Sequence, residues 1–197
     1  MKTIKKLASI VFIIFGVVAF TNAQSFVVNN GQSTVKWTGK KVGGEHYGTI
    51  KFSSGTLQVS NGQVSTGVFE MDMTSIVCED ITNEGSNQRL VNHLKSDDFF
   101  SVETNPKSRM TITGAKKTSG NEYEFTGTLT IKGISNPITF KAKTDVSGST
   151  LKASGIIVVD RAKYDIKFRS ASFFQNLGDN LIYDDFTLDF TIVANTL

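Results

Sequence analysis

Cysteine and histidine are scarce in this sequence, with one cysteine and two histidines in 197 residues. The single cysteine, Cys78, cannot form an internal disulfide, so a hydrophobic core has to hold the fold. We predict that Cys78 is a small, partly buried residue, with an intermolecular disulfide as the alternative. His46 and His93 are far apart in the sequence, whereas a metal site needs three or four converging ligands. We therefore expect no metal site and assign both histidines to surface or hydrogen-bonding roles.

The sequence also lacks the patterns of common catalytic sites. It contains no Gly-x-Ser-x-Gly element, and the glycine-rich run at residues 43–48 is interpreted as a bend, because no helix pattern follows it. The carboxylate pairs, Asp97 with Asp98 and Asp184 with Asp185, are interpreted as solvated turns. An enzyme would need a polar cluster inside the fold, which the sequence does not indicate. We therefore predict a protein that is not an enzyme and carries no cofactor.

Long hydrophobic runs are confined to the first 23 residues. Three lysines precede an apolar stretch at residues 7–20, and Thr21 and Ala23 supply the small residues of a cleavage site before Gln24. The stretch is shorter than the roughly 20 residues that span a bilayer, and its flanks are those of a secretory signal peptide. We predict a periplasmic or secreted protein whose mature chain, residues 24–197, forms a single domain.

An excess of either charge is also absent once this segment is removed. The segment carries three lysines and no acidic residue, which leaves 18 basic and 18 acidic side chains. The mature chain therefore has no net charge and no long-range attraction for nucleic acid or an anionic membrane. We expect no nucleic-acid partner.

What the sequence does contain is alternation with a period of two, the pattern of half-buried β-strands. At the C-terminus, for example, Phe186, Leu188 and Phe190 alternate with polar residues. Turn signals such as Asn61 followed by Gly62 separate the runs. The pattern predicts eight strands, near residues 33–42, 46–60, 63–75, 108–117, 121–132, 137–147, 150–160 and 183–194.

Two segments interrupt the alternation. Residues 81–100 indicate a short helix, because Leu90 and Leu94 fall on one helical face, and two phenylalanines follow. Residues 161–182 contain Phe168, Phe173 and Phe174 among polar residues and are interpreted as a long loop or lid.

Eight antiparallel strands in one domain favour a closed β-barrel, which leaves no exposed sheet edge, with a β-sandwich as the alternative. A barrel of this size is either filled by its own side chains or holds one small ligand. The apolar strand faces supply the candidate lining residues. They are Trp37, Phe52, Met71, Met73, Phe125, Leu129, Phe140, Leu188 and Phe190.

A succession of motifs along the mature chain resembles the YceI-like family. The motifs comprise residues 37–40, 44–52, 72–76, 93–100, 127–133 and 160–161, in the order that the family has them. The resemblance implies a lipocalin-like antiparallel barrel whose interior holds a long isoprenoid chain, such as a polyprenyl phosphate or a quinone tail. It attaches no catalytic activity. A membrane, contacted transiently, and a second copy of the chain, in a homodimer, are further candidate partners.

The remaining candidates lie at the ends of the barrel, and each has a structural alternative. Leu94, Phe99 and Phe100 are predicted either to close one mouth around a ligand or to plug that end. Asp160 and Arg161 follow an apolar strand, where the arginine would hold a head group or anchor the adjoining loop. The competing hypothesis is a structural or interaction module with a filled barrel and a functional 161–182 loop.

Overall fold

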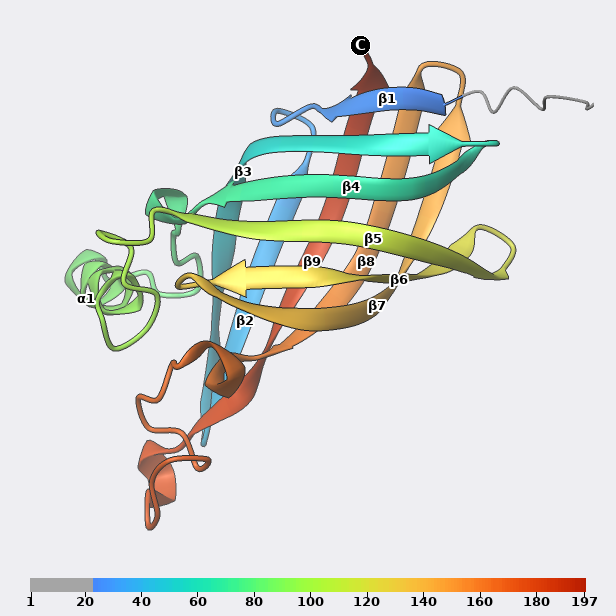
Figure 1. Ribbon diagram of the computed structural model, residues 1–197. Coiled ribbons are helices and arrows are strands. Elements are labelled where there is room, and N and C mark those ends of the chain that lie inside the picture. The colour runs from blue at the N-terminus through green and yellow to red at the C-terminus, as the bar shows by residue number, and fades with distance from the viewer. Residues whose placement is uncertain (1–22) are drawn as a thin grey trace, which may run out of the picture.

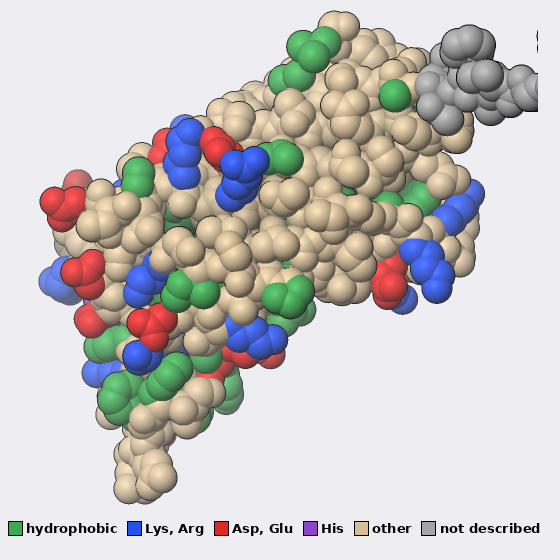
Figure 2. All heavy atoms as spheres, viewed as in Figure 1, with side chains coloured by type: hydrophobic (Ala, Val, Ile, Leu, Met, Phe, Trp, Pro, Cys, Tyr) green, Lys and Arg blue, Asp and Glu red, His purple; other side chains and the backbone are tan. Residues whose placement is uncertain are grey.

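The computed structural model describes residues 23–197, which form an antiparallel barrel with irregular segments gathered at one end (Figure 1). The predicted signal peptide, apart from its last residue, lies outside the described residues. Within residues 23–197, no helix combines the length and hydrophobicity needed to cross a bilayer. Basic and acidic side chains are interspersed on the face shown in Figure 2.

The strands are β1 (Ala23–Val28), β2 (Thr34–Lys41), β3 (Gly44–Ser60), β4 (Gln63–Asp72), β5 (Lys107–Ser119), β6 (Glu122–Ile131), β7 (Ile134–Ser147), β8 (Thr150–Asp160) and β9 (Ile182–Thr196). The helical elements are the α-helix α1 (Glu84–Lys95) and the short 3-10 helices η1 (Met73–Ser75), η2 (Arg161–Tyr164) and η3 (Gly178–Asn180).

The barrel closes in the order β3-β2-β9-β8-β7-β6-β5-β4, with β4 pairing back to β3, and every pair is antiparallel. The predicted eight-stranded lipocalin-like barrel is therefore confirmed. A ninth strand, β1, was not predicted. It pairs with residues 56–60 of β3 and with the end of β9, whereas β2 pairs with residues 44–50 of β3. β1 and β2 thus share one position of the barrel. β1 is only six residues long and directly follows the hydrophobic N-terminal segment. Its alternation was therefore too short to be recognised in the sequence.

The strand faces follow the predicted alternation, and their burial changes along the barrel. On β9, Phe190 and Ile192 are buried and Thr191 between them is exposed. Phe186 and Leu188 on the same inner face are only half-buried, because they lie nearer the end of the barrel that carries the irregular segments.

Two local predictions need correction. The strand predicted for residues 63–75 ends at Asp72, whose carboxylate accepts a hydrogen bond of 3.0 Å from the Thr74 amide and starts η1. The glycine-rich run at residues 43–48 is a bend only at its start, since β3 begins at Gly44.

The helix α1 lies against one end of the barrel (Figure 1). Its first turn is capped by Asn83, whose side chain accepts a hydrogen bond of 2.9 Å from the Ser86 amide. The helix buries Val91, and Leu94 packs against the barrel core. Leu90, predicted to share that face, is half-buried and lies outside the core cluster.

The strands β7 and β8 are paired along only part of their length, from Ala142 with Gly155 to Ser147 with Thr150. Near the start of β7 and the end of β8, the two strands are not paired, and η2 lies against β7 instead. There the Asn136 side chain donates a hydrogen bond of 2.9 Å to the Lys163 carbonyl. Tyr164 is buried in the common core just after this contact. The first residues of the 161–182 segment therefore form part of the barrel wall, in the gap between β7 and β8.

Candidate functional site

The interior of the barrel contains a cavity of about 200 Å³ with an almost entirely apolar lining. All thirteen candidate residues named from the sequence line this one cavity, although the strands and segments that carry them are far apart in the chain. They are Trp37, Phe52, Met71, Met73, Leu94, Phe99, Phe100, Phe125, Leu129, Phe140, Arg161, Leu188 and Phe190. Their contact with a ligand remains a prediction.

Other residues line the cavity without having been predicted from the sequence, among them Met110, Ile131 and Phe186. Each belongs to an alternating run and occupies the inner position of its strand. Counting every inner position of the predicted strands, rather than the aromatic and methionine positions alone, would have found them.

Aromatic rings form one wall of the cavity. Phe125 and Phe140 are stacked, with centroids 5.6 Å apart, and Phe140 meets Phe190 edge-on at 6.1 Å. These three rings come from three different strands, β6, β7 and β9. Such pairs hold their rings in defined orientations, so this wall is the more rigid part of the cavity.

Methionines form a more adaptable part of the lining. Met71, Met73 and Met110 are all of the methionines in residues 23–197, and all three line the cavity. An unbranched thioether side chain changes shape easily to fit irregular contents. The cavity is smaller than the roughly 300–1,000 Å³ of most small-molecule sites. A long chain would therefore require these side chains to rearrange.

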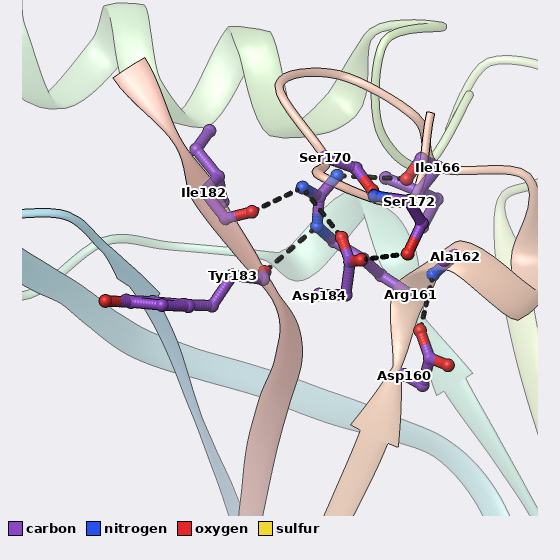
Figure 3. A network of polar contacts seen from close by, with 9 residues as sticks. All are labelled: Asp160, Arg161, Ala162, Ile166, Ser170, Ser172, Ile182, Tyr183 and Asp184. Atoms are coloured by element: carbon purple, nitrogen blue, oxygen red, sulfur yellow. Dashed lines mark hydrogen bonds and ion pairs between the residues drawn. The ribbon is translucent and has the colours of Figure 1, made fainter. Parts of the chain in front are cut away.

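The Arg161 side chain is buried at the edge of the cavity, with 4% of its surface exposed, and its guanidinium is occupied by backbone groups (Figure 3). Nε donates to the Tyr183 carbonyl at 3.1 Å, Nη1 to the Ile166 carbonyl at 2.9 Å, and Nη2 to the Ile182 carbonyl at 2.9 Å. These contacts join the two ends of the 161–182 segment. They support the anchoring alternative, whereas a head-group contact stays a prediction.

Two carboxylates complete the surroundings of Arg161. Asp184 Oδ1 lies 3.3 Å from Nη2 as an ion pair, without a hydrogen bond of good geometry, and Oδ2 accepts a 2.7 Å hydrogen bond from Ser172. Asp160 instead caps η2 by accepting from the Ala162 amide at 2.9 Å. Burial lowers the pKa of Arg161 below its ordinary value and the two carboxylates oppose this, so the guanidinium stays charged.

Further aromatic contacts lie at the end of the cavity nearest α1. Phe100 meets Phe186 edge-on at 6.3 Å, joining the segment after α1 to β9. His93 packs edge-on against Phe99 at 5.0 Å and Phe168 at 4.6 Å, joining α1 to the 161–182 segment. Of the three phenylalanines in that segment, Phe168 is therefore packed inward.

The histidines and the cysteine have structural surroundings. His46 Nδ1 lies 2.7 Å from Asp80 Oδ2, and Asp80 Oδ1 accepts from the Tyr47 amide at 2.9 Å and from the Cys78 thiol at 3.3 Å. These bonds attach the segment after η1 to β3. Cys78 is buried and unpaired, and burial raises the pKa of its thiol. Within residues 23–197, no group of three or more metal-binding side chains is found together.

A closed antiparallel barrel with an apolar cavity and irregular segments at one end is the architecture of lipocalin-like binding barrels. The chain belongs to the YceI-like family, whose domain matches residues 26–194. It is 31% identical over 97 residues to Protein YceI of Salmonella arizonae, a match that covers 49% of this chain and 48% of that protein. The chain thus spans about half the length of the curated relatives it matches.

Solved structures share the fold. BcnA of Burkholderia cenocepacia superimposes with a TM-score of 0.69 at 19% identity, covering 85% of this chain and 99% of BcnA. A polyisoprenoid-binding domain from Saccharophagus degradans, implicated in plant cell wall breakdown, superimposes with a TM-score of 0.63 at 13% identity, covering 88% and 99%. At these identities the likeness is one of fold.

Proposed function

We propose that this protein is an exported, non-enzymatic carrier that holds a long apolar lipid of isoprenoid type, a polyprenyl phosphate or a quinone tail, inside the barrel. The observation that carries the proposal is the cavity itself, whose lining is apolar and includes three adaptable methionines. A structural relative described as a polyisoprenoid-binding domain supports the ligand class.

The energetics indicate exchange with a membrane rather than irreversible capture. Each buried methylene contributes about 0.8 kcal/mol, so one five-carbon unit contributes roughly 3 to 4 kcal/mol and eight units about 30. Non-covalent affinities saturate near roughly −20 kcal/mol, so ordering of the chain has to offset much of this sum. A bilayer offers the same chain nearly equal burial. Small differences between the two environments therefore set the direction of transfer.

The test measures lipid bound to the purified protein. Protein from its own host, examined by native mass spectrometry and organic extraction, should carry a long isoprenoid, and the apo protein should bind added polyprenyl phosphate. Ala153 is buried on the cavity wall, so Ala153→Phe should lower the bound fraction by filling the cavity. Ser154 is its exposed neighbour on β8, and Ser154→Phe is the matched control. Protein that never binds lipid, or an Ala153→Phe variant that folds and binds normally, would overturn the proposal.

A second candidate function is an interaction module that acts through the 161–182 segment. The outward position of Phe173 and Phe174, which are 44% and 50% exposed, favours it. It predicts that replacing these rings abolishes partner binding while the protein never carries lipid, which the same mass spectra decide.

A further inference from the structure

Exposed aromatic side chains are concentrated on one projection of the molecule. Among the exposed large hydrophobic residues of the described chain, the aromatic ones are Phe173, Phe174 and Tyr183, and the last is 49% exposed. All three lie within eleven consecutive positions, residues 173–183. Hydrophobic side chains also gather on the lower part of the molecule in Figure 2, near the projection that Figure 1 assigns to this segment. We call these three residues, with Lys167 and Arg169, the aromatic tip.

Basic side chains accompany these rings. The Lys167 ammonium lies 5.4 Å from the centroid of the exposed Phe173 ring, whereas the Arg169 guanidinium lies 5.1 Å from the centroid of Phe168, which packs inward. Residues 160–185 contain four basic and five acidic residues, and the Lys167 ammonium is also paired with the Asp165 carboxylate at 2.7 Å, so this region carries no excess of positive charge. Aromatic rings beside Lys and Arg are the combination that proteins place at the level of lipid head groups.

The aromatic tip is continuous with the cavity. Tyr183 and its neighbour Ile182 line the cavity, and their carbonyls are held by Arg161. Figure 3 shows the Tyr183 ring pointing away from the Arg161 network. The same short stretch of β9 therefore forms part of the cavity wall and carries an exposed ring, so whatever the tip contacts lies beside the cavity.

We propose that the aromatic tip docks on the surface of a lipid bilayer and brings the adjoining end of the cavity to the membrane. This inference rests on the proposed function in one respect, namely that the cavity exchanges a lipid with that membrane. A bilayer fits the tip better than a protein does, because Phe173 and Phe174 project from an irregular segment whose two ends, at Arg161 and Ile182, line an apolar cavity.

The test is co-sedimentation of the full mature chain with vesicles of phosphatidylcholine containing a minority of phosphatidylglycerol. The double variant Phe173→Ser, Phe174→Ser should bind these vesicles at least about tenfold more weakly than the wild type, because two rings no longer enter the interface. The matched control is Ile156→Thr, Val158→Thr. It removes two apolar side chains, each 58% exposed, from the outer face of β8 and should bind like the wild type.

Three results would overturn the inference: wild-type protein that does not sediment with vesicles, two variants that bind equally well, or a tip variant that loses only self-association in analytical ultracentrifugation. The last result would assign the tip to a second copy of the chain. Loading of polyprenyl phosphate from detergent micelles is measured in parallel. A tip variant that loads normally but does not bind vesicles supports the inference, whereas wild-type protein that fails to load from detergent defeats the proposed function instead. Melting temperatures establish that both variants are folded.

Discussion

Removal of the Arg161 side chain should destabilise the protein and release the 161–182 segment. In Arg161→Met, the carbonyls of Ile166, Ile182 and Tyr183 lose their donor, and the Asp184 carboxylate loses its cation. Removing one partner of a buried ion pair costs roughly 3–5 kcal/mol. Because Asp184 retains 20% exposure, we expect the lower end, about 3 kcal/mol of the free energy of unfolding.

Lysine at the same position should restore only part of this stability. Arg161→Lys keeps the charge but has no planar fork to reach three carbonyls at once, so we expect a loss of about 1–2 kcal/mol. Urea denaturation measures both losses. For a chain of this size, 3 kcal/mol corresponds to a decrease in melting temperature of roughly 6–12 °C. Limited proteolysis should cut Arg161→Met first within residues 161–182.

One pattern of results would exclude Arg161 as an anchor of the 161–182 segment. If Arg161→Met loses less than about 1 kcal/mol and its 161–182 segment stays resistant to protease, the guanidinium is not a structural anchor. If the same variant also binds polyprenyl phosphate more weakly but binds an uncharged polyprenol normally, Arg161 contacts the head group.

Three further predictions concern the segment after η1. A Cβ at Gly48 would lie 1.9 Å from the Val77 carbonyl oxygen, so Gly48→Ala should lower the free energy of unfolding in urea by about 2 kcal/mol or more. The control is Gly39→Ala, whose Cβ would meet no atom within 4 Å and which should change this free energy little. Burial raises the pKa of Asp80, but its hydrogen bonds with His46, Tyr47 and Cys78 lower this pKa overall. The Asp80 carboxylate therefore stabilises the fold at any pH above its unfolded-state pKa of about 3.9. This contribution is lost as the pH falls through the lower pKa of the folded state. Wild type and Asp80→Asn should therefore differ in stability at neutral pH and converge in acid. The buried Cys78 thiol should react with iodoacetamide at pH 8 far more slowly in native than in urea-unfolded protein, and equal rates would contradict its burial.

Glycines in the family motifs illustrate what the structure adds to a sequence pattern. Gly48 and Gly127 belong to motifs that carried the family resemblance, but the sequence offered no reason for glycine there. In the structure, a Cβ at Gly127 would lie 2.1 Å from the Thr111 carbonyl oxygen. Both glycines allow another part of the backbone to approach closely, which is a long-range contact and leaves no local signal.

The thirteen candidate residues surround one cavity because the direction of a side chain on a strand is a local property, whereas their contact with a ligand stays a prediction. Side chains on a strand alternate between its two faces, so Phe125, Leu129 and Phe190 had to point the same way as their apolar neighbours once strands formed. Closure of the barrel then brought these faces together. The volume of the cavity was not predictable, because it depends on how the side chains of eight strands fill the interior.

Sequence alone therefore predicted the strands and which of their side chains share a face, because a period of two is a property of each strand by itself. The pairing of β4 with β3, which closes a barrel rather than a sandwich, depends on the tertiary structure. Only the tertiary structure decided the arrangement of the 161–182 segment. Phe168, Phe173 and Phe174 are chemically identical and lie within seven positions, yet the first packs against His93 and the other two face solvent. An irregular segment has no periodicity to orient its side chains. Long-range contacts, above all those of Arg161, set their directions instead.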